Sequence, residues 1–538
     1  MSEFIRPALD WHALAPELTL LGVGAFLTLI DIFFAERARA ITSALAGLGL
    51  LGVLVPIITL ASAGVASEPR VMFDGGYVVD GYSLVLKALF VITGYVVVLL
   101  STNYFAEGDY WENEYYGLLA ASMLGMLVMT SARDLITIFI ALELLSIPVY
   151  LMAAWRKRDL KSNEAGLKYY LVGVVASAVL LYGMSLLFGV SGSTLLSDIG
   201  SSADLGSGVD SPAMVTLGVI FVLAGLAFKV SAFPFHTWAP DTYEGAPTPV
   251  TAFLSVASKA AGFVALANLV FVGFWDRSDV YQPVFWILAA ASMTAGNFMA
   301  LRQTNIVRLM AYSGVAQAGF LLAPLAVAGE SAGVADDALQ AIVVYLAIYA
   351  AMNLGVFAVI IAVARRTRTG RVESYNGLFR TAPAMAVIMT VFLASLAGVP
   401  PAGGWYAKFS IFRALISPGI TWGYVLAAVA AVNAVIAVGY YGKIVARMWF
   451  EKPWVPETAL DEIQEKTPND VPEVVAAESI VAAETIVKTD AGTSSSLPFA
   501  LVLALGLSLA ATLLFGIVPG TLTHFTEVTL LPTIFTGS

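Results

Sequence analysis

Four ionisable side chains stand in the middle of long apolar runs of this sequence, and they are its best candidates for chemistry. They are Glu143, Lys229, Lys259 and Lys408. A charge near the centre of a bilayer is energetically costly, so such residues usually bind or move ions. In general, desolvation lowers the pKa of a lysine and a nearby carboxylate raises it again. A glutamate that approached and left a buried lysine would therefore move protons stepwise, without a metal or a cofactor.

Other ionisable residues are weaker candidates. His236 follows a proline and could pass protons near neutral pH, although a hydrogen-bonded structural role fits it almost equally well. Lys168 lies at the mouth of a predicted span beside Glu164, where proton transfer and simple ion pairing are equally open. Lys87 and Lys443 lie nearer the ends of their spans, so we expect their long side chains to reach the membrane interface.

Two of the candidate lysines lie close to residues that break helices. Pro234 comes five residues after Lys229, and Pro400 and Pro401 come shortly before Lys408. Proline lacks a backbone N–H and should interrupt both helices near the middle of the membrane. Interrupted helices in corresponding halves of a transporter mark its ion path. We therefore expect a repeat architecture in which each repeat has one broken helix.

The composition predicts the elements that carry these residues. The chain has 538 residues, of which 59% are hydrophobic and 12% charged, with a mean hydropathy of +0.83. Apolar runs of about 18 to 25 residues match the length that a helix needs to cross the ~30 Å hydrocarbon core. A soluble globular enzyme is excluded. The fold class is an all-α polytopic membrane protein with two inverted five-helix repeats and about fourteen transmembrane helices, centred near residues 24, 51, 90, 123, 144, 178, 221, 260, 292, 315, 351, 395, 434 and 508.

The residue types argue against a redox centre in this chain. It has no cysteine, which excludes thiolate-bound zinc and ordinary iron–sulfur clusters. His12, His236 and His524 are a poor supply for the paired ligands of membrane haems. The GxGxxG spacing at 47–52 lies inside an apolar span, so we interpret it as small residues that let helices pack closely.

Charge patterning predicts an orientation. Basic residues at 37–39, 156–161 and 365–371 fall on one face if the spans alternate, and this face should be cytoplasmic, with both termini outside. The acidic segment 103–114 fits this arrangement poorly. We expect the first span to remain, because no signal-peptide pattern precedes it.

One segment differs from the rest of the chain. Residues 451–497 hold ten acidic and three basic residues, or −7 of the net charge of −10. We interpret them as a disordered or partly helical cytoplasmic insertion, with docking of a partner as the less favoured alternative. The acidic balance therefore gives no indication of nucleic-acid binding.

Several motifs resemble one family. From about residue 80 to 449 the sequence resembles the antiporter-like subunit N of bacterial NADH–quinone oxidoreductase, respiratory complex I, which corresponds to mitochondrial subunit 2. The most specific stretch is FHTWAPDTYEGAPTPVTAFLSV at 235–256. Independent matches are ALELLS at 141–146, ALRQTN at 300–305 and LAGVPP at 396–401.

The resemblance implies roles for individual residues. Glu143 matches the fifth-helix glutamate, Lys229 its seventh-helix partner, Lys259 the central eighth-helix lysine and Lys408 the terminal proton carrier of the twelfth helix. The sequence departs from the family pattern at Gln317, where a histidine is expected, and Val307 precedes Arg308 where a lysine is common. The glutamine puts a proton step between the two half-channels in doubt.

The resemblance also implies the surroundings of the chain. FMN, iron–sulfur clusters and quinone would belong to other subunits. The partners would be membrane-arm subunits, especially the K-type and M-type neighbours, and lipids, in the bacterial cytoplasmic membrane. The predicted domains are N-terminal helices (1–114), two half-channel repeats (115–272 and 273–450), the acidic insertion (451–497) and a C-terminal helix with its tail (498–538).

Three functions stay open from the sequence. The first is a proton-translocating subunit driven by quinone reduction in neighbouring subunits. The second is a subunit of a related cation/proton antiporter or membrane-bound hydrogenase. The third is a purely structural helix bundle that spaces other subunits.

Overall fold

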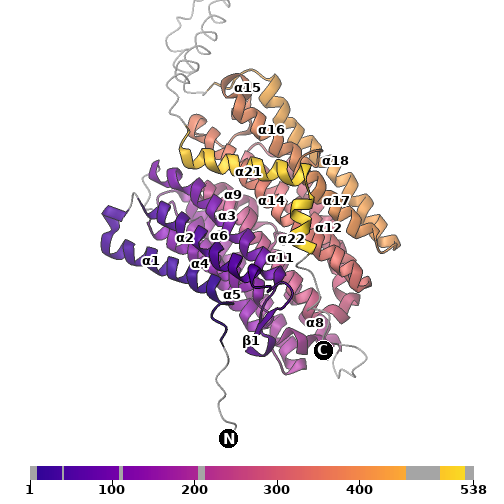
Figure 1. Ribbon diagram of the computed structural model, residues 1–538. Coiled ribbons are helices and arrows are strands. Elements are labelled where there is room, and N and C mark those ends of the chain that lie inside the picture. Colours follow the sequence, from indigo (N-terminus) through magenta and orange to yellow (C-terminus); the bar gives the residue numbers. More distant parts are fainter. Residues whose placement is uncertain (1–8, 39–40, 108–112, 204–211, 456–496, 528–538) are drawn as a thin grey trace, which may run out of the picture.

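A computed structural model describes residues 9–38, 41–107, 113–203, 212–455 and 497–527, and helices dominate these ranges (Figure 1). The predicted insertion 451–497 lies almost wholly outside the described residues. The helices and strands are α1 (Ala15–Ala38), α2 (Thr42–Ser62), β1 (Arg70–Met72), β2 (Tyr77–Val79), α3 (Gly81–Glu107), α4 (Asn113–Ser131), α5 (Leu135–Ala153), α6 (Leu160–Ser191), α7 (Leu196–Ala203), α8 (Pro212–Lys229), α9 (Trp238–Gly245), α10 (Thr248–Phe253), α11 (Lys259–Asn268), α12 (Ser278–Leu301), α13 (Ile306–Leu322), α14 (Ala332–Thr367), α15 (Leu378–Thr381), α16 (Pro383–Ala397), α17 (Gly403–Ile416), α18 (Thr421–Phe450), α21 (Phe499–Ile517) and α22 (Gly520–Glu527).

The predicted membrane-spanning architecture is confirmed. Twelve helices within the described ranges are long and apolar enough to cross a membrane, and α16 is a shorter apolar helix. All fourteen centres expected from the sequence fall inside a helix, because α4 and the interrupted α16–α17 pair account for the other two. The assignment of these helices to two half-channel repeats stays a prediction.

Both predicted interruptions are present. The helix α8 ends at Lys229 and α9 begins at Trp238, while α16 ends at Ala397 and α17 begins at Gly403. Gly398 closes α16 with a φ of +92°, a conformation that glycine adopts at little cost. Each break leaves helix-end backbone groups inside the bundle, where side chains can bind them.

The helices in the centre of the bundle have almost no exposed face. Residues 248–273 are buried almost throughout, and so are most residues of α13 and α14. Within 248–273, two π-helical turns, Leu254–Ser258 and Leu269–Gly273, flank α11. Lys259 therefore begins α11 directly after a local change of helical pitch.

The expectation for Lys87 is wrong, whereas that for Lys443 stays a prediction. Lys443 is exposed on α18. Lys87 on α3 has no exposed surface, and its Nζ lies 2.7 Å from Glu17 Oε1 on α1. Tyr77, in the short antiparallel β1–β2 hairpin, donates a hydrogen bond to the same carboxylate oxygen at 2.8 Å. A buried carboxylate partner, which a single-helix argument does not consider, keeps the ammonium inside the protein.

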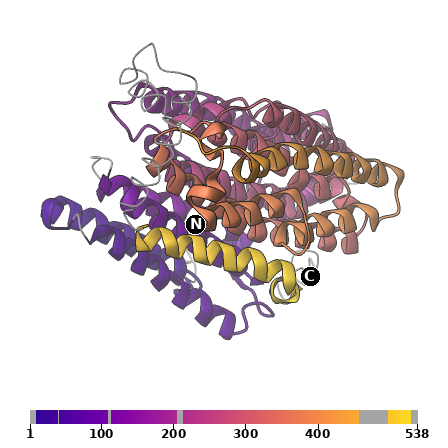
Figure 2. The ribbon, with the colours of Figure 1, turned by 90° about the horizontal axis from the view of Figure 1, so that it is seen from above.

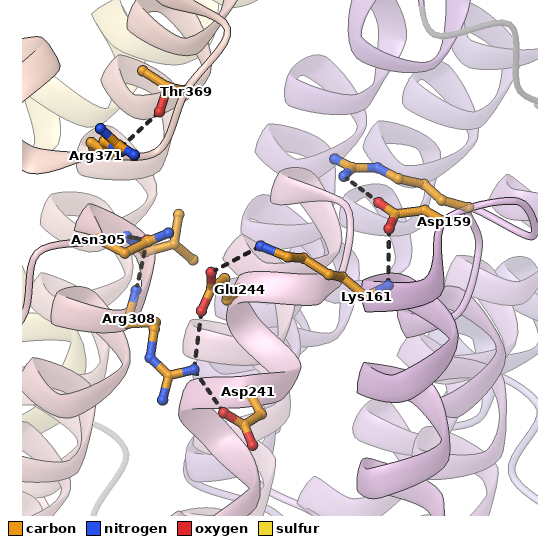
Figure 3. Close-up of polar contacts among 10 residues, drawn as sticks. Asp159, Lys161, Asp241, Glu244, Asn305, Arg308, Thr369 and Arg371 are labelled. Atoms are coloured by element: carbon orange, nitrogen blue, oxygen red, sulfur yellow. Dashed lines mark hydrogen bonds and ion pairs between the residues drawn. The ribbon is translucent and has the colours of Figure 1, made fainter.

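Two of the predicted basic loops lie at the same end of the bundle (Figure 3). Lys161, just after the first loop, contacts Glu244 on α9, and Glu244 also contacts Arg308 at the start of α13. Arg371, in the second loop, bridges to Asn305 beside Arg308. The end of α3 joins them through a hydrogen bond from the guanidinium of Arg156 to the hydroxyl of Tyr104. The end of α3 therefore lies at this same end of the bundle, as alternation of the spans requires.

The last membrane-spanning helix of the described ranges connects distant parts of the chain. The helix α21 packs against α3, α14 and α17, and so lies between the N-terminal helices and the later ones (Figures 1 and 2). At its far end, Gly516 approaches the break between α16 and α17 so closely that a Cβ there would lie 2.0 Å from the Pro401 carbonyl oxygen.

Candidate proton-transfer site

Lys229 lies at the last residue of α8, where the helix breaks. Its Nζ donates to Ser146 Oγ on α5 at 2.8 Å and to the Tyr169 hydroxyl on α6 at 3.4 Å. The side chain is 3% exposed. The carbonyl end of a helix carries partial negative charge, which favours an ammonium group at this position. From α11, Gly262 packs against the stem of Lys229, since a Cβ at that glycine would lie 3.1 Å from Lys229 Cγ.

Glu143 lies one helical turn before Ser146 on α5 and is half-buried. Its carboxylate accepts a hydrogen bond of 2.5 Å from Ser177 Oγ on α6. Within the described part of the chain, no ion pair of 4.0 Å or less joins Glu143 to Lys229. Glu143 and Lys229 are therefore neighbours through α5, each held by a serine, and are not in direct contact.

Lys259 lies in the buried centre of the bundle. Its Nζ donates to the carbonyl oxygen of Gly314 on α13 at 2.7 Å, and its exposed fraction is 2%. A Cβ at position 314 would lie 2.9 Å from this Nζ. Glycine is therefore the residue that lets the ammonium reach the backbone of α13.

Lys408 binds the end of the broken helix that precedes it. Its Nζ donates to the carbonyl oxygens of Leu396 at 3.0 Å and Ala397 at 2.7 Å. The last carbonyls of a helix have no partner within the helix, and the helix dipole makes that end negative. The Phe320 ring, with its centre 5.0 Å from Nζ, adds a cation–π contact. The break therefore creates the oxygen site that holds Lys408.

Gln317 lies between Lys259 and Lys408. Its amide nitrogen donates to the Leu396 carbonyl at 3.4 Å, an oxygen that also accepts from Lys408, and to the Tyr441 hydroxyl at 3.3 Å. The Tyr345 hydroxyl donates to its amide oxygen. Gln317 is one helical turn after Gly314, so α13 contacts both lysines. A glutamine amide can donate and accept hydrogen bonds, but it does not titrate as a histidine would.

The two weaker candidates lie in different surroundings. His236 is buried between α8 and α9, with its ring centre 6.2 Å from that of Tyr312 on α13. Lys168 is nearer the surface, and its Nζ lies 2.7 Å from both a Glu164 oxygen and an Asp241 oxygen. Lys168 thus belongs to a surface ion cluster, and no hydrogen bond between described residues joins it to Lys229.

Sequence reasoning missed the neutral partners of Glu143 and of two lysines, Lys229 and Lys259. Three of these partners are single small residues in apolar helices, of a kind that is common there for packing reasons: Ser146, Ser177 and Gly314. The fourth, Tyr169, is a large aromatic residue between Lys168 and Tyr170. Ser146 did carry a signal, because it follows Glu143 at the three-residue spacing of neighbours on one helix face. Tyr169, Ser177 and Gly314 come from other helices, so only the fold brings them in.

Comparison with known proteins gives the family. The family described as "NADH:quinone oxidoreductase/Mrp antiporter, TM" matches residues 132–434, which include all four principal candidates. The NADH-quinone oxidoreductase subunit N of Trichlorobacter lovleyi is 37% identical over 444 residues, covering 82% of this chain and 88% of that one. The chain belongs to the NADH-quinone oxidoreductase subunit N family. This confirms the resemblance found in the motifs.

Solved structures agree with the fold of the subunit N family. A chain of respiratory complex I from Thermus thermophilus is 27% identical with a TM-score of 0.67, covering 93% of this chain and 98% of that one. A chain of the Mrp complex from Dietzia is similar with a TM-score of 0.75 at 21% identity, covering 97% of each chain. At that identity the second similarity shows a shared fold alone.

Proposed function

We propose that this chain is a proton-translocating membrane-arm subunit of an NADH–quinone oxidoreductase. Membership of the subunit N family supports the assignment to that complex. The observation that carries the proton role is that three buried lysines, Lys229, Lys259 and Lys408, have only neutral oxygen partners among the described residues.

The contrast with two other buried cations supports this role. Lys87 is paired with Glu17 at 2.7 Å, and Arg133 is paired with Asp80 at 3.3 Å. A buried ammonium without an anion is costly, and releasing its proton relieves that cost. The three unpaired lysines are therefore suited to exchange protons, whereas the paired cations are suited to hold the structure together.

The proposed pathway follows the polar contacts. Approach of Glu143 would favour protonation of Lys229, and withdrawal would favour release towards Lys259. From Lys259, Gln317 and water would connect to Lys408, the terminal carrier. His236 and Lys168 are proposed as auxiliary groups. Because Gln317 does not titrate, protons would pass it through reorienting water and hydroxyl groups.

The surroundings are part of the same proposal. Electron transfer through FMN, iron–sulfur clusters and quinone would occur in other subunits and drive this one. The neighbours would be the K-type and M-type subunits in the bacterial cytoplasmic membrane, with both termini outside. Residues 115–272 and 273–450 would form the two half-channels.

Replacement of Lys229 in the assembled complex tests the proposal. Lys229→Ala should sharply lower the number of protons pumped per NADH oxidised in inverted membrane vesicles, because the first carrier is lost. Lys229→Arg keeps a buried cation that does not deprotonate, so it should preserve assembly and still lower pumping. The matched control is Lys443→Ala, which removes an exposed lysine and should leave pumping unchanged.

Two results would contradict the proposal. Normal pumping per electron in both Lys229 variants, with full assembly, would favour the structural spacer. Sodium-dependent exchange in vesicles without NADH oxidation would favour a cation/proton antiporter.

A further inference from the structure

A charged cavity opens at the end of the bundle that carries the basic loops. Its volume is about 150 Å³, and it is lined by charged side chains from three helices: Lys161, Glu164 and Lys168 on α6, Asp241 and Glu244 on α9, and Arg308 on α13. Figure 3 shows four of them, Lys161, Asp241, Glu244 and Arg308. The charges balance, three positive against three negative. This balance gives no preference for a charged ligand. The charged side chains instead pair with one another.

Both carboxylates of α9 are held by neighbouring helices. Asp241 lies 2.7 Å from Lys168 Nζ through one oxygen and 2.7 Å from Arg308 through the other. Glu244 lies 3.0 Å from Arg308 and 3.6 Å from Lys161. We call these five residues the α9 clamp. It ties α9 to α6 and α13. Asp241 forms an ion pair of 2.7 Å with each of these two helices.

The same short helix also contacts the Lys229 site. Trp238, three residues before Asp241, stacks on Tyr169 with ring centres 4.4 Å apart and planes 19° apart. Its Nε1 donates to the Phe228 carbonyl at 3.2 Å, in the last turn of α8. Tyr169 in turn accepts the hydrogen bond from Lys229. A continuous set of contacts therefore leads from the clamp to the first proton carrier.

This helix depends on such contacts for its position. It has eight residues, no side-chain hydrogen bond at its N-cap and a break before it. A helix of two turns is not stable alone, so tertiary contacts must fix it. The ion pairs of Asp241 are direct charged contacts that tie α9 to both α6 and α13.

We propose that Asp241 is a positioning residue for the proton site at Lys229, acting through α9 and the stacked Trp238 and Tyr169 rings. This inference rests on the proposed proton-transfer function. Without the clamp, α9 shifts, Tyr169 loses its stacked partner and its hydroxyl moves relative to Lys229 Nζ. The hydrogen bond from Lys229 Nζ to the Tyr169 hydroxyl is already long, at 3.4 Å, so a small shift of the hydroxyl would break it.

The first experiment replaces Asp241 in the intact complex. Asp241→Asn removes both ion pairs, and the protons pumped per NADH oxidised should fall at least about twofold, because small misplacements of reacting groups are costly. Asp241→Glu should pump nearly as many protons per NADH as the unmodified complex, since it retains the carboxylate. The matched control is Glu164→Gln, because Glu164 also contacts Lys168 but does not contact α9.

The second experiment keeps the clamp intact and removes the stack. Trp238→Leu should lower pumping to a similar extent as Asp241→Asn. If both act through α9, the double variant should be no worse than the more severe single variant, whereas independent effects would multiply. This measurement also covers the case in which Asp241→Asn fails to assemble, because Trp238→Leu leaves every charge in place.

The outcomes separate this inference from the proposed function. Unchanged pumping in Asp241→Asn, with reduced pumping in Lys229→Ala, would overturn the positioning role alone. Multiplicative effects of Asp241→Asn and Trp238→Leu in the double variant would overturn the route through Trp238. Unchanged pumping in Asp241→Asn, Trp238→Leu and Lys229→Ala alike would overturn the proposed function as well.

Discussion

At the scale of single residues, the partner of a buried cation separates structural charges from exchangeable ones. Lys87 contacts a carboxylate, whereas Lys259 contacts a backbone carbonyl of α13. Replacement of one partner of a buried pair leaves the other charge without compensation. The two kinds of lysine should therefore respond differently to substitution.

Lys87→Met should destabilise the protein without a specific effect on coupling. The substitution leaves Glu17 buried and unpaired, which should lower the free energy of unfolding by about 3–5 kcal/mol. Thermal unfolding of the solubilised complex and the amount of assembled subunit measure this. The double variant with Glu17→Met should recover most of the stability. Normal stability of the single variant would show that Glu17 does not need Lys87.

The sequence located the principal charged residues at this scale but not their partners. Apolar context alone identifies Glu143, Lys259 and Lys408, because a charge inside such a run is rare. The misjudged residue was Lys87, whose partner lies 70 positions earlier on another helix. Contacts of that kind depend on the tertiary fold and leave no local signal.

At the scale of elements, the breaks supply oxygen atoms that an intact helix would use internally. Lys408 binds the two carbonyls at the end of α16, and the positive φ of Gly398 lets the chain turn away there. Proline and glycine predicted this break from sequence. The π-helical turns beside Lys259 were not predictable, because no residue type specifies them and packing of neighbouring helices selects them.

Gly398→Ala should impair the Lys408 site. A Cβ at this position would lie 2.9 Å from Lys408 Cδ, and alanine is strained by about 1–2 kcal/mol at positive φ. We expect lower pumping per electron with most of the complex assembled. The matched control is Gly442→Ala on α18, where a Cβ meets no atom within 4 Å. Equal pumping in the two variants would contradict the proposed geometry of the Lys408 site.

At the scale of the whole molecule, α21 joins the N-terminal helices to the second break. It contacts α3 on one side and α14 and α17 on the other, far from all of them in sequence. The apolar pattern predicts such a helix and its length. It does not predict where the helix docks, since lipid-facing and protein-facing apolar residues look alike.

Gly516→Ala should loosen this connection. The new Cβ would lie 2.0 Å from the Pro401 carbonyl oxygen, and backbone atoms cannot yield as a flexible side chain can. Overpacking of this kind should lower the free energy of unfolding by about 1–3 kcal/mol. Gly506→Ala on the same helix meets no atom within 4 Å and should be harmless. Proteolysis rates of the two variants measure the difference, and equal rates would contradict the close docking of α21.

The burial of Lys229, Lys259 and Lys408 has an electrical consequence. A proton that moves from bulk water to a lysine inside the membrane carries its charge through part of the transmembrane field. The membrane voltage therefore acts on each occupied lysine, by ~2.3 kcal/mol per 100 mV for a charge that crosses the full thickness. Collapse of the voltage by an ionophore should consequently change how these three sites share their protons, even at constant pH on both sides.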